Sequence, residues 1–93
     1  MLASEAVQAA KDHILELFKG ENIVRVGLEE LEFRVEDDIW EVTIGFQRPW
    51  QAESSDLLPS VLRPQIGRTY KIVCIRDDGT FVSMNHRDVS IPA

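Results

Sequence analysis

The sequence has 93 residues, with 16 acidic and 10 basic side chains, one cysteine and 44% apolar residues, and its formal net charge is −6. This length fits one domain with a single small core. The negative charge disfavours binding to nucleic-acid phosphates as a main activity, and a lone cysteine cannot form an internal disulfide. No apolar run reaches the roughly 20 residues of a membrane span, and no secretory signal pattern is visible. We therefore expect a cytoplasmic protein that binds neither nucleic acid nor membrane.

The first predicted element is a helix over residues 4–19. Its apolar residues recur with the helical period of 3.6, so they form one stripe that must be buried. Ser4 is expected to cap the start of the helix, and Gly20 to take the left-handed position that ends it. The stripe consists of Val7, Ala10, Ile14, Leu17 and Phe18.

A first predicted hairpin joins strands 28–36 and 39–47. A turn centred on Asp37-Asp38 brings apolar residues opposite one another on one face, which is the pattern that fixes a strand register. The predicted pairs are Val35 with Trp40, Phe33 with Val42, and Leu31 with Ile44.

A second predicted hairpin joins strands 68–77 and 80–87. Asp78-Gly79 favours a type I′ turn, because both central residues of that turn need a positive φ. The helix-facing pairs are then Ile75 with Val82, Val73 with Met84, and Lys71 with His86. The reverse face is only half polar, since it carries Tyr70, Ile72, Cys74 and Phe81.

These elements predict a single α+β domain over residues 1–93, in which one N-terminal helix packs on a four-stranded antiparallel meander. Consecutive hairpins that are neighbours in space are the usual connection. The predicted core comprises Val7, Ala10, Ile14, Leu17, Phe18, Leu31, Phe33, Val35, Trp40, Val42, Ile44, Val73, Ile75, Val82 and Met84.

The acidic residues are concentrated in the first half of the chain. Up to Gln47 there are 11 acidic and 4 basic side chains, and seven of the acids lie between Glu29 and Glu41. Such a run is typical of a solvated sheet face. The alternative is a docking surface for a basic partner.

The predicted hairpins are joined by a long loop, residues 48–67. A connection of this length is unusual in a compact domain. Its apolar side chains, Trp50, Leu57 and Leu58 among them, either fold back on their own sheet or contact a second subunit or partner. The terminal residues 88–93 are expected to fray.

Few residues suggest catalysis. Cys74 lies in a strand on an apolar background without a second cysteine, which is typical of an inert buried thiol. His13 and His86 are expected at the surface, and one cysteine with two distant histidines cannot supply a zinc site. No glycine-rich phosphate loop is present. We therefore expect no metal, no cofactor and no enzymatic activity.

The succession of a helix and paired strands resembles a PepSY-type or cystatin-like module, of the layout found in many small bacterial domains. The resemblance is carried by the strand Trp40-Glu41-Val42, the strand Tyr70-Lys71-Ile72, and the turn Asp77-Asp78-Gly79 that leads into Phe81-Val82. It implies a non-catalytic unit that binds or restrains a partner protein. The hairpin tip, Val35 to Ile39, departs from the Gln-x-Val-x-Gly tip through which cystatins inhibit proteases.

The leading functional hypothesis is therefore a non-enzymatic interaction or regulatory module, with a protein partner or a second copy in a homodimer. Its candidate contact residues are Arg48, Trp50, Leu57, Leu58, Tyr70 and Phe81. The alternative is a small-molecule-binding domain or minor enzyme. Its pocket would lie between the sheet and the Trp50 loop, lined by Tyr70, Arg48, Arg68 and His86. A third possibility is a structural domain of a larger protein.

Overall fold

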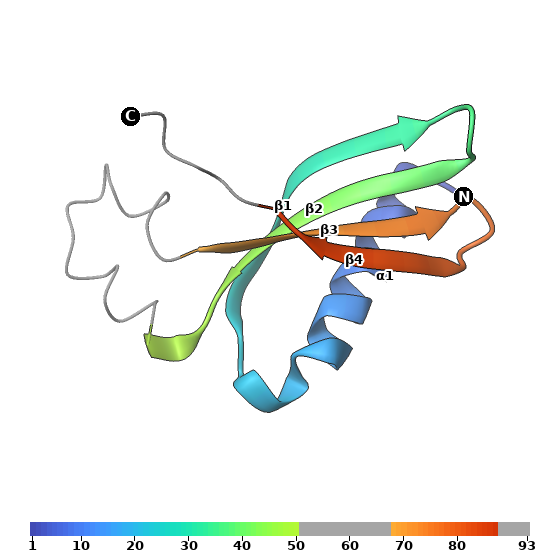
Figure 1. Ribbon diagram of the computed structural model, residues 1–93. Coiled ribbons are helices and arrows are strands. Elements are labelled where there is room, and N and C mark those ends of the chain that lie inside the picture. Colours follow the sequence, from blue (N-terminus) through green and yellow to red (C-terminus); the bar gives the residue numbers. More distant parts are fainter. Residues whose placement is uncertain (51–67, 88–93) are drawn as a thin grey trace, which may run out of the picture.

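The computed structural model describes residues 1–50 and 68–87 of the chain. Its elements are α1 (Ala3–Leu17), the short 3₁₀ turn η1 (Lys19–Glu21), β1 (Val24–Arg34), β2 (Ile39–Gln47), β3 (Thr69–Arg76) and β4 (Phe81–His86). The four strands form one antiparallel sheet in the order β1-β2-β3-β4 (Figure 1). The predicted α+β fold, with an N-terminal helix on a four-stranded meander, is confirmed.

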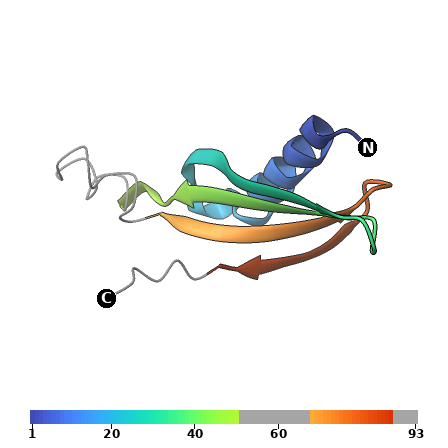
Figure 2. The ribbon, with the colours of Figure 1, turned by 90° about the horizontal axis from the view of Figure 1, so that it is seen from above.

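The core lies between α1 and one face of the sheet, here called the helix-facing side (Figure 2). Ala6, Ala10 and Ile14 of α1 are fully buried there at four-residue spacing. The two alanines keep the helix close to the strands, because a methyl group takes little space. The buried residues of the sheet are Val42, Ile44, Phe46, Val73 and Ile75.

Three residues of the predicted core are in fact exposed: Leu17 by 55%, Val35 by 77% and Val82 by 39%. Leu17 is the last residue of α1, where the chain turns and Phe18 packs instead on Phe46, with ring centroids 5.0 Å apart. Val35 falls in the turn after β1. The fully buried Ala6 and Phe46 were not predicted.

The helix ends also differ from the prediction. α1 starts at Ala3, one residue before Ser4, and its N-cap is Leu2, whose backbone N–H donates to Glu5 Oε1 at 2.6 Å. The carboxylate of Glu5 therefore satisfies an N–H at the helix start, the role expected of the Ser4 hydroxyl. At the other end the left-handed residue is Asn22, with φ 51°, rather than Gly20.

The register of the first hairpin is two residues from the prediction. Phe33 pairs with Trp40, and Leu31 with Val42, so the turn is centred one residue earlier than Asp37-Asp38. The rings of Phe33 and Trp40 stack with centroids 4.6 Å apart, and aromatic cross-strand pairs are among the more stabilising ones. Because side chains alternate with a period of two, this shift leaves residues 30–34 on their predicted faces. The register shift between Leu28 and Glu30 instead brings Leu28 beside Ile44, on the helix-facing side.

The second hairpin keeps the predicted pairs from Lys71–His86 to Cys74–Ser83. Its turn is not type I′, since Gly79 has a positive φ of 94° and Asp78 does not. Gly79 N–H donates to Arg76 O, and Arg76 N–H to Thr80 O, each at 2.8 Å. These bonds define a turn that ends in a left-handed glycine bulge. A second irregularity follows, because Ile75 pairs with Phe81 and leaves Val82 as the extra residue.

Much of the predicted loop, including Leu57 and Leu58, lies outside the described residues, as does the predicted frayed end 88–93. Within residues 1–50 and 68–87, no helix is both long enough and apolar enough to cross a bilayer.

Candidate functional site

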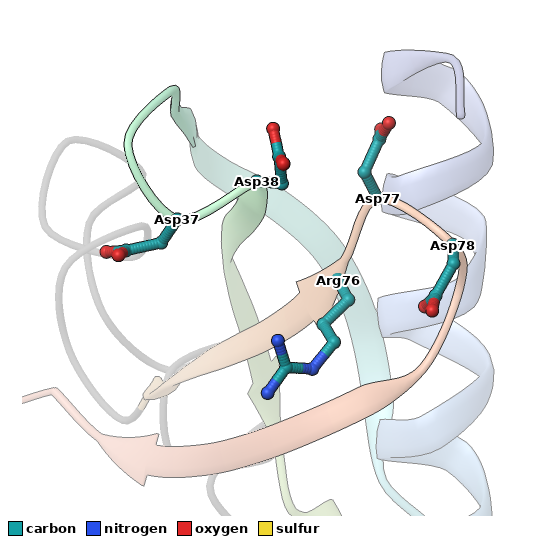
Figure 3. Close-up of a pocket in the computed structure, with 5 residues that line it drawn as sticks. All are labelled: Asp37, Asp38, Arg76, Asp77 and Asp78. Atoms are coloured by element: carbon teal, nitrogen blue, oxygen red, sulfur yellow. The ribbon is translucent and has the colours of Figure 1, made fainter.

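The tips of the two hairpins lie together and enclose a hollow of about 420 Å³. Asp77 N–H donates to Asp38 O at 2.9 Å and so joins the two turns. Four carboxylates and Arg76 line the hollow, but Figure 3 shows the carboxylates pointing in different directions. In the described part of the chain, no three potential metal ligands gather. The tips are therefore a joint between the hairpins rather than a preformed cation site.

Two of these carboxylates are held by hydrogen bonds. The indole N–H of Trp40 donates to Asp77 Oδ1 at 3.1 Å, and the Met1 α-amino group lies 3.2 Å from the same oxygen. These two donors, Trp40 first, lower the pKa of Asp77 below its usual range. The side chain and backbone of Thr80 lower the pKa of Asp78 in the same way. Both side chains therefore stay ionised at neutral pH.

This arrangement predicts an acid-sensitive joint. A carboxyl whose pKa is lower in the folded chain stabilises the fold above its unfolded value of 3.8. That contribution is lost as the pH falls through the lowered folded value. We expect Asp77→Asn to reduce the free energy of unfolding at pH 6. The difference from the wild type should shrink towards zero as the pH falls below about 4.

Urea denaturation at a series of pH values measures this difference. Glu36→Gln is the matched control, because it also removes one exposed carboxylate from a hairpin tip. The same pH dependence for both variants would show that the Trp40–Asp77 bond does not contribute.

On the sheet face opposite α1, here called the second face, the edge strands reach towards each other. Arg87, directly after β4, forms an ion pair with Glu30 of β1 across the two middle strands. The pair borders a hollow of about 140 Å³ whose floor includes Thr43 and Ile72. Thr43 is buried, although no described helix packs on this face. Long charged side chains thus cover part of the apolar surface that the sequence left without a cover.

A second ion pair on this face explains a glycine in the middle strand. Arg68 Nη2 lies 3.0 Å from Glu29 Oε1. A Cβ at Gly45 would meet both atoms at 2.8 Å, so the pair occupies the space that a side chain would need. The Arg68 side chain is only 13% exposed, and its Nε is buried without a hydrogen bond. Arg68 is thus held close to the sheet.

Arg48 has a structural position on the helix-facing side. Its Nε donates to Glu21 of η1 at 2.8 Å, and its Nη1 donates to Thr69 of β3 at 3.2 Å. The guanidinium lies within 6 Å of the rings of Phe18 and Phe46, which is the range of a cation–π contact. Arg48 therefore ties the end of the helix to the ends of two strands.

The residues proposed for a ligand pocket are divided between the two faces. Arg68 and Tyr70 belong to the second face, whereas Arg48 belongs to the helix-facing side. His86 pairs with Lys71, whose ammonium group lies 6.0 Å from the centroid of the Phe18 ring on that same side. One pocket cannot gather all four without reaching around the sheet, so their role in binding stays a prediction.

The described residues proposed for partner binding are similarly dispersed. Trp50 is 64% exposed and is the last residue of the first described segment. Phe81 was predicted on the reverse face with Tyr70, and this is wrong. Its ring lies 4.7 Å from that of His13 of α1, because the bulge at Val82 turns Phe81 to the helix-facing side. Phe81 nevertheless remains 38% exposed.

The two edges of the sheet differ in a way that sequence analysis did not single out. β1 contains two register shifts and carries five charged side chains, features that discourage a further strand from pairing. β4 reads Phe-Val-Ser-Met-Asn-His and contains no acidic, lysine or arginine residue. Its first two side chains, Phe81 and Val82, are exposed. The sequence feature that could have identified this edge is the absence of charged residues from the last predicted strand.

No protein-family model matches the chain, and no curated protein or solved structure shows a significant similarity to it. The resemblance to PepSY-type and cystatin-like modules therefore stays a prediction.

Proposed function

We propose that this protein is a non-enzymatic interaction module that binds a protein partner through β4. The observation that carries the proposal is the contrast between the two sheet edges. Proteins usually protect an edge strand with charges, prolines or bulges, since its free N–H and C=O groups pair readily with another chain. β1 is protected in these ways, whereas β4 has one bulge at its start and no charge.

Strand addition is the binding mode that such an edge supports. A partner strand would gain main-chain hydrogen bonds along β4, and neighbouring side chains would provide selectivity. Val82 and Phe81 offer exposed apolar surface at one end of the strand, and α1 lies behind Phe81 through His13. β4 itself loses little conformational freedom on binding, because its backbone is already ordered in the sheet.

A charged substitution at the edge tests this function. We expect Val82→Lys to reduce capture of the partner by at least about tenfold, because a lysine on an edge strand opposes pairing with a further strand. Leu15→Lys on α1 is the matched control. It places the same charge at a similarly exposed apolar position, away from β4.

The tagged full chain is crosslinked and purified from the cells that produce it, and the proteins that co-purify are quantified. An untagged copy of the chain counts as a partner. A protein retained by the wild type and by Leu15→Lys, but lost by Val82→Lys, supports the function. Equal capture by both variants, or capture of no protein, would contradict it.

A further inference from the structure

The backbone groups of β4 alternate along the strand between the side that pairs with β3 and the opposite side. Arg87 N–H donates to Tyr70 O at 3.0 Å, so this amide points inward to β3. In an antiparallel ladder, successive residues direct their amides to opposite sides. The amide of Met84, three residues earlier, therefore points outward, away from β3. Among the described residues no strand lies on that side of β4, so Met84 offers its N–H and C=O to a further strand.

The charges at the two ends of β4 have opposite sign. The turn before the strand carries Asp77 and Asp78, and its neighbour in space is the acidic turn of the first hairpin. The other end carries Arg87, with Lys71 beside His86. The lowered pKa values of both aspartates keep the acidic end negative at neutral pH. The strand thus has an acidic start and a basic end, with uncharged residues between them.

We propose that the partner bound by β4 is a second copy of this chain, paired antiparallel, edge to edge. The inference rests on the proposed function and names its partner. In the antiparallel arrangement the acidic start of each β4 lies beside the basic end of the other, whereas a parallel arrangement places like charges together. Because a twofold axis repeats every contact, the dimer contains two pairings of an acidic strand start with a basic strand end.

The geometry of such a pair follows from the strand. The twofold axis passes near Ser83 and Met84, the middle of β4, and the two sheets form one continuous eight-stranded sheet. A twofold axis perpendicular to the sheet keeps both α1 helices on the same side. The Phe81–His13 contact of each copy then flanks the junction. Val82 of each copy gains a strand beside it, which removes apolar surface from water.

Sedimentation velocity of the full chain, from about 1 μM to about 1 mM, covers the range of weak self-association. We expect a monomer–dimer equilibrium that Val82→Lys weakens by at least about tenfold, since like charges then meet across the junction. Leu15→Lys should stay within about twofold of the wild type. Raising the salt from about 0.05 M to about 0.5 M should also weaken the dimer, because the paired ends are exposed.

Engineered cysteines test the orientation in a Cys74→Ser background. Ser83→Cys places both thiols close to the twofold axis, where cross-strand Cβ atoms come within disulfide range. Thr80→Cys places them at opposite ends of the junction. We expect a disulfide-linked dimer for Ser83→Cys and little for Thr80→Cys, whereas a parallel pair would link both variants equally.

The outcomes separate this inference from the proposed function. A chain that stays monomeric while another protein binds in a Val82-dependent manner overturns the second copy as partner and leaves the interaction function intact. A monomer whose outward-pointing Met84 amide is protected from hydrogen exchange, like the amides that bond to β3, means that a segment of the same chain occupies the edge, which contradicts both. A dimer unaffected by Val82→Lys overturns the β4 junction.

Discussion

Replacing Phe46 by alanine is expected to lower the free energy of unfolding by about 3–5 kcal/mol, the usual cost of removing a buried phenyl ring. Phe46 has no exposed surface and lies against Phe18, at the point where α1 ends. It also lies within 5.8 Å of the Arg48 guanidinium. The substitution would therefore leave a cavity and weaken the connection between the helix and the sheet. A domain of this size has a total stability of about 5–15 kcal/mol, so this loss is a large share.

Urea denaturation followed by tryptophan fluorescence and circular dichroism measures this change. Phe46→Leu is the control, because it keeps much of the apolar volume and should cost clearly less than the alanine variant. An alanine variant within about 1 kcal/mol of the wild type would mean that Phe18 and Arg48 close over the space, and that Phe46 does not hold the helix end in place.

Phe46 also shows what the sequence could predict of the core. It continues the alternation of Trp40, Val42 and Ile44, so its face was readable. The predicted first strand began at residue 28, whereas β1 starts at Val24, and Val24 pairs with Gln47 beside Phe46. The predicted register placed the charged Glu29 opposite Phe46, whereas the two register shifts of β1 bring Val26 against the core at this end of the sheet. The bulges, which alternation does not reveal, were the weak point.

The strand register of the first hairpin could not be predicted from the sequence for a related reason. From Glu30 to Arg34, the two registers of the first hairpin differ by two residues and put the same side chains on the same faces. The hydrophobic pattern alone cannot separate them. The stacking of Phe33 on Trp40, and the bond from Trp40 to Asp77 in the other hairpin, involve shapes and contacts that a binary pattern does not contain.

The candidate interaction edge follows from topology and composition together. The predicted meander already made the last strand an edge, and its six residues contain no acidic, lysine or arginine side chain. The bulge at Val82, which turns Phe81 towards His13, was not predictable from alternation. One inserted residue changes the face of everything before it. The sequence therefore located the edge, and the structure decided which of its aromatic residues faces the helix.

The second prediction with a large effect compares two apolar residues, Ile14 and Leu17, that the helical period places on the same face of the helix. We expect Ile14→Ala to cost about 2–5 kcal/mol of unfolding free energy, because Ile14 is fully buried against the sheet. Leu17→Ala should stay within about 0.5 kcal/mol of the wild type, since its side chain is already half exposed. Both changes leave alanine, a strong helix former, so helix propensity does not account for the difference.

Thermal and urea denaturation of the two variants measure this contrast. The helical period assigns an angle around the helix axis, but it does not say where along the axis the sheet ends. Ile14 lies over the strands, whereas at Leu17 the helix ends and Phe18 takes over the packing. Similar costs for both variants would mean that Leu17 is covered in solution, and that the apolar surface of α1 extends beyond Ile14 to a second contact.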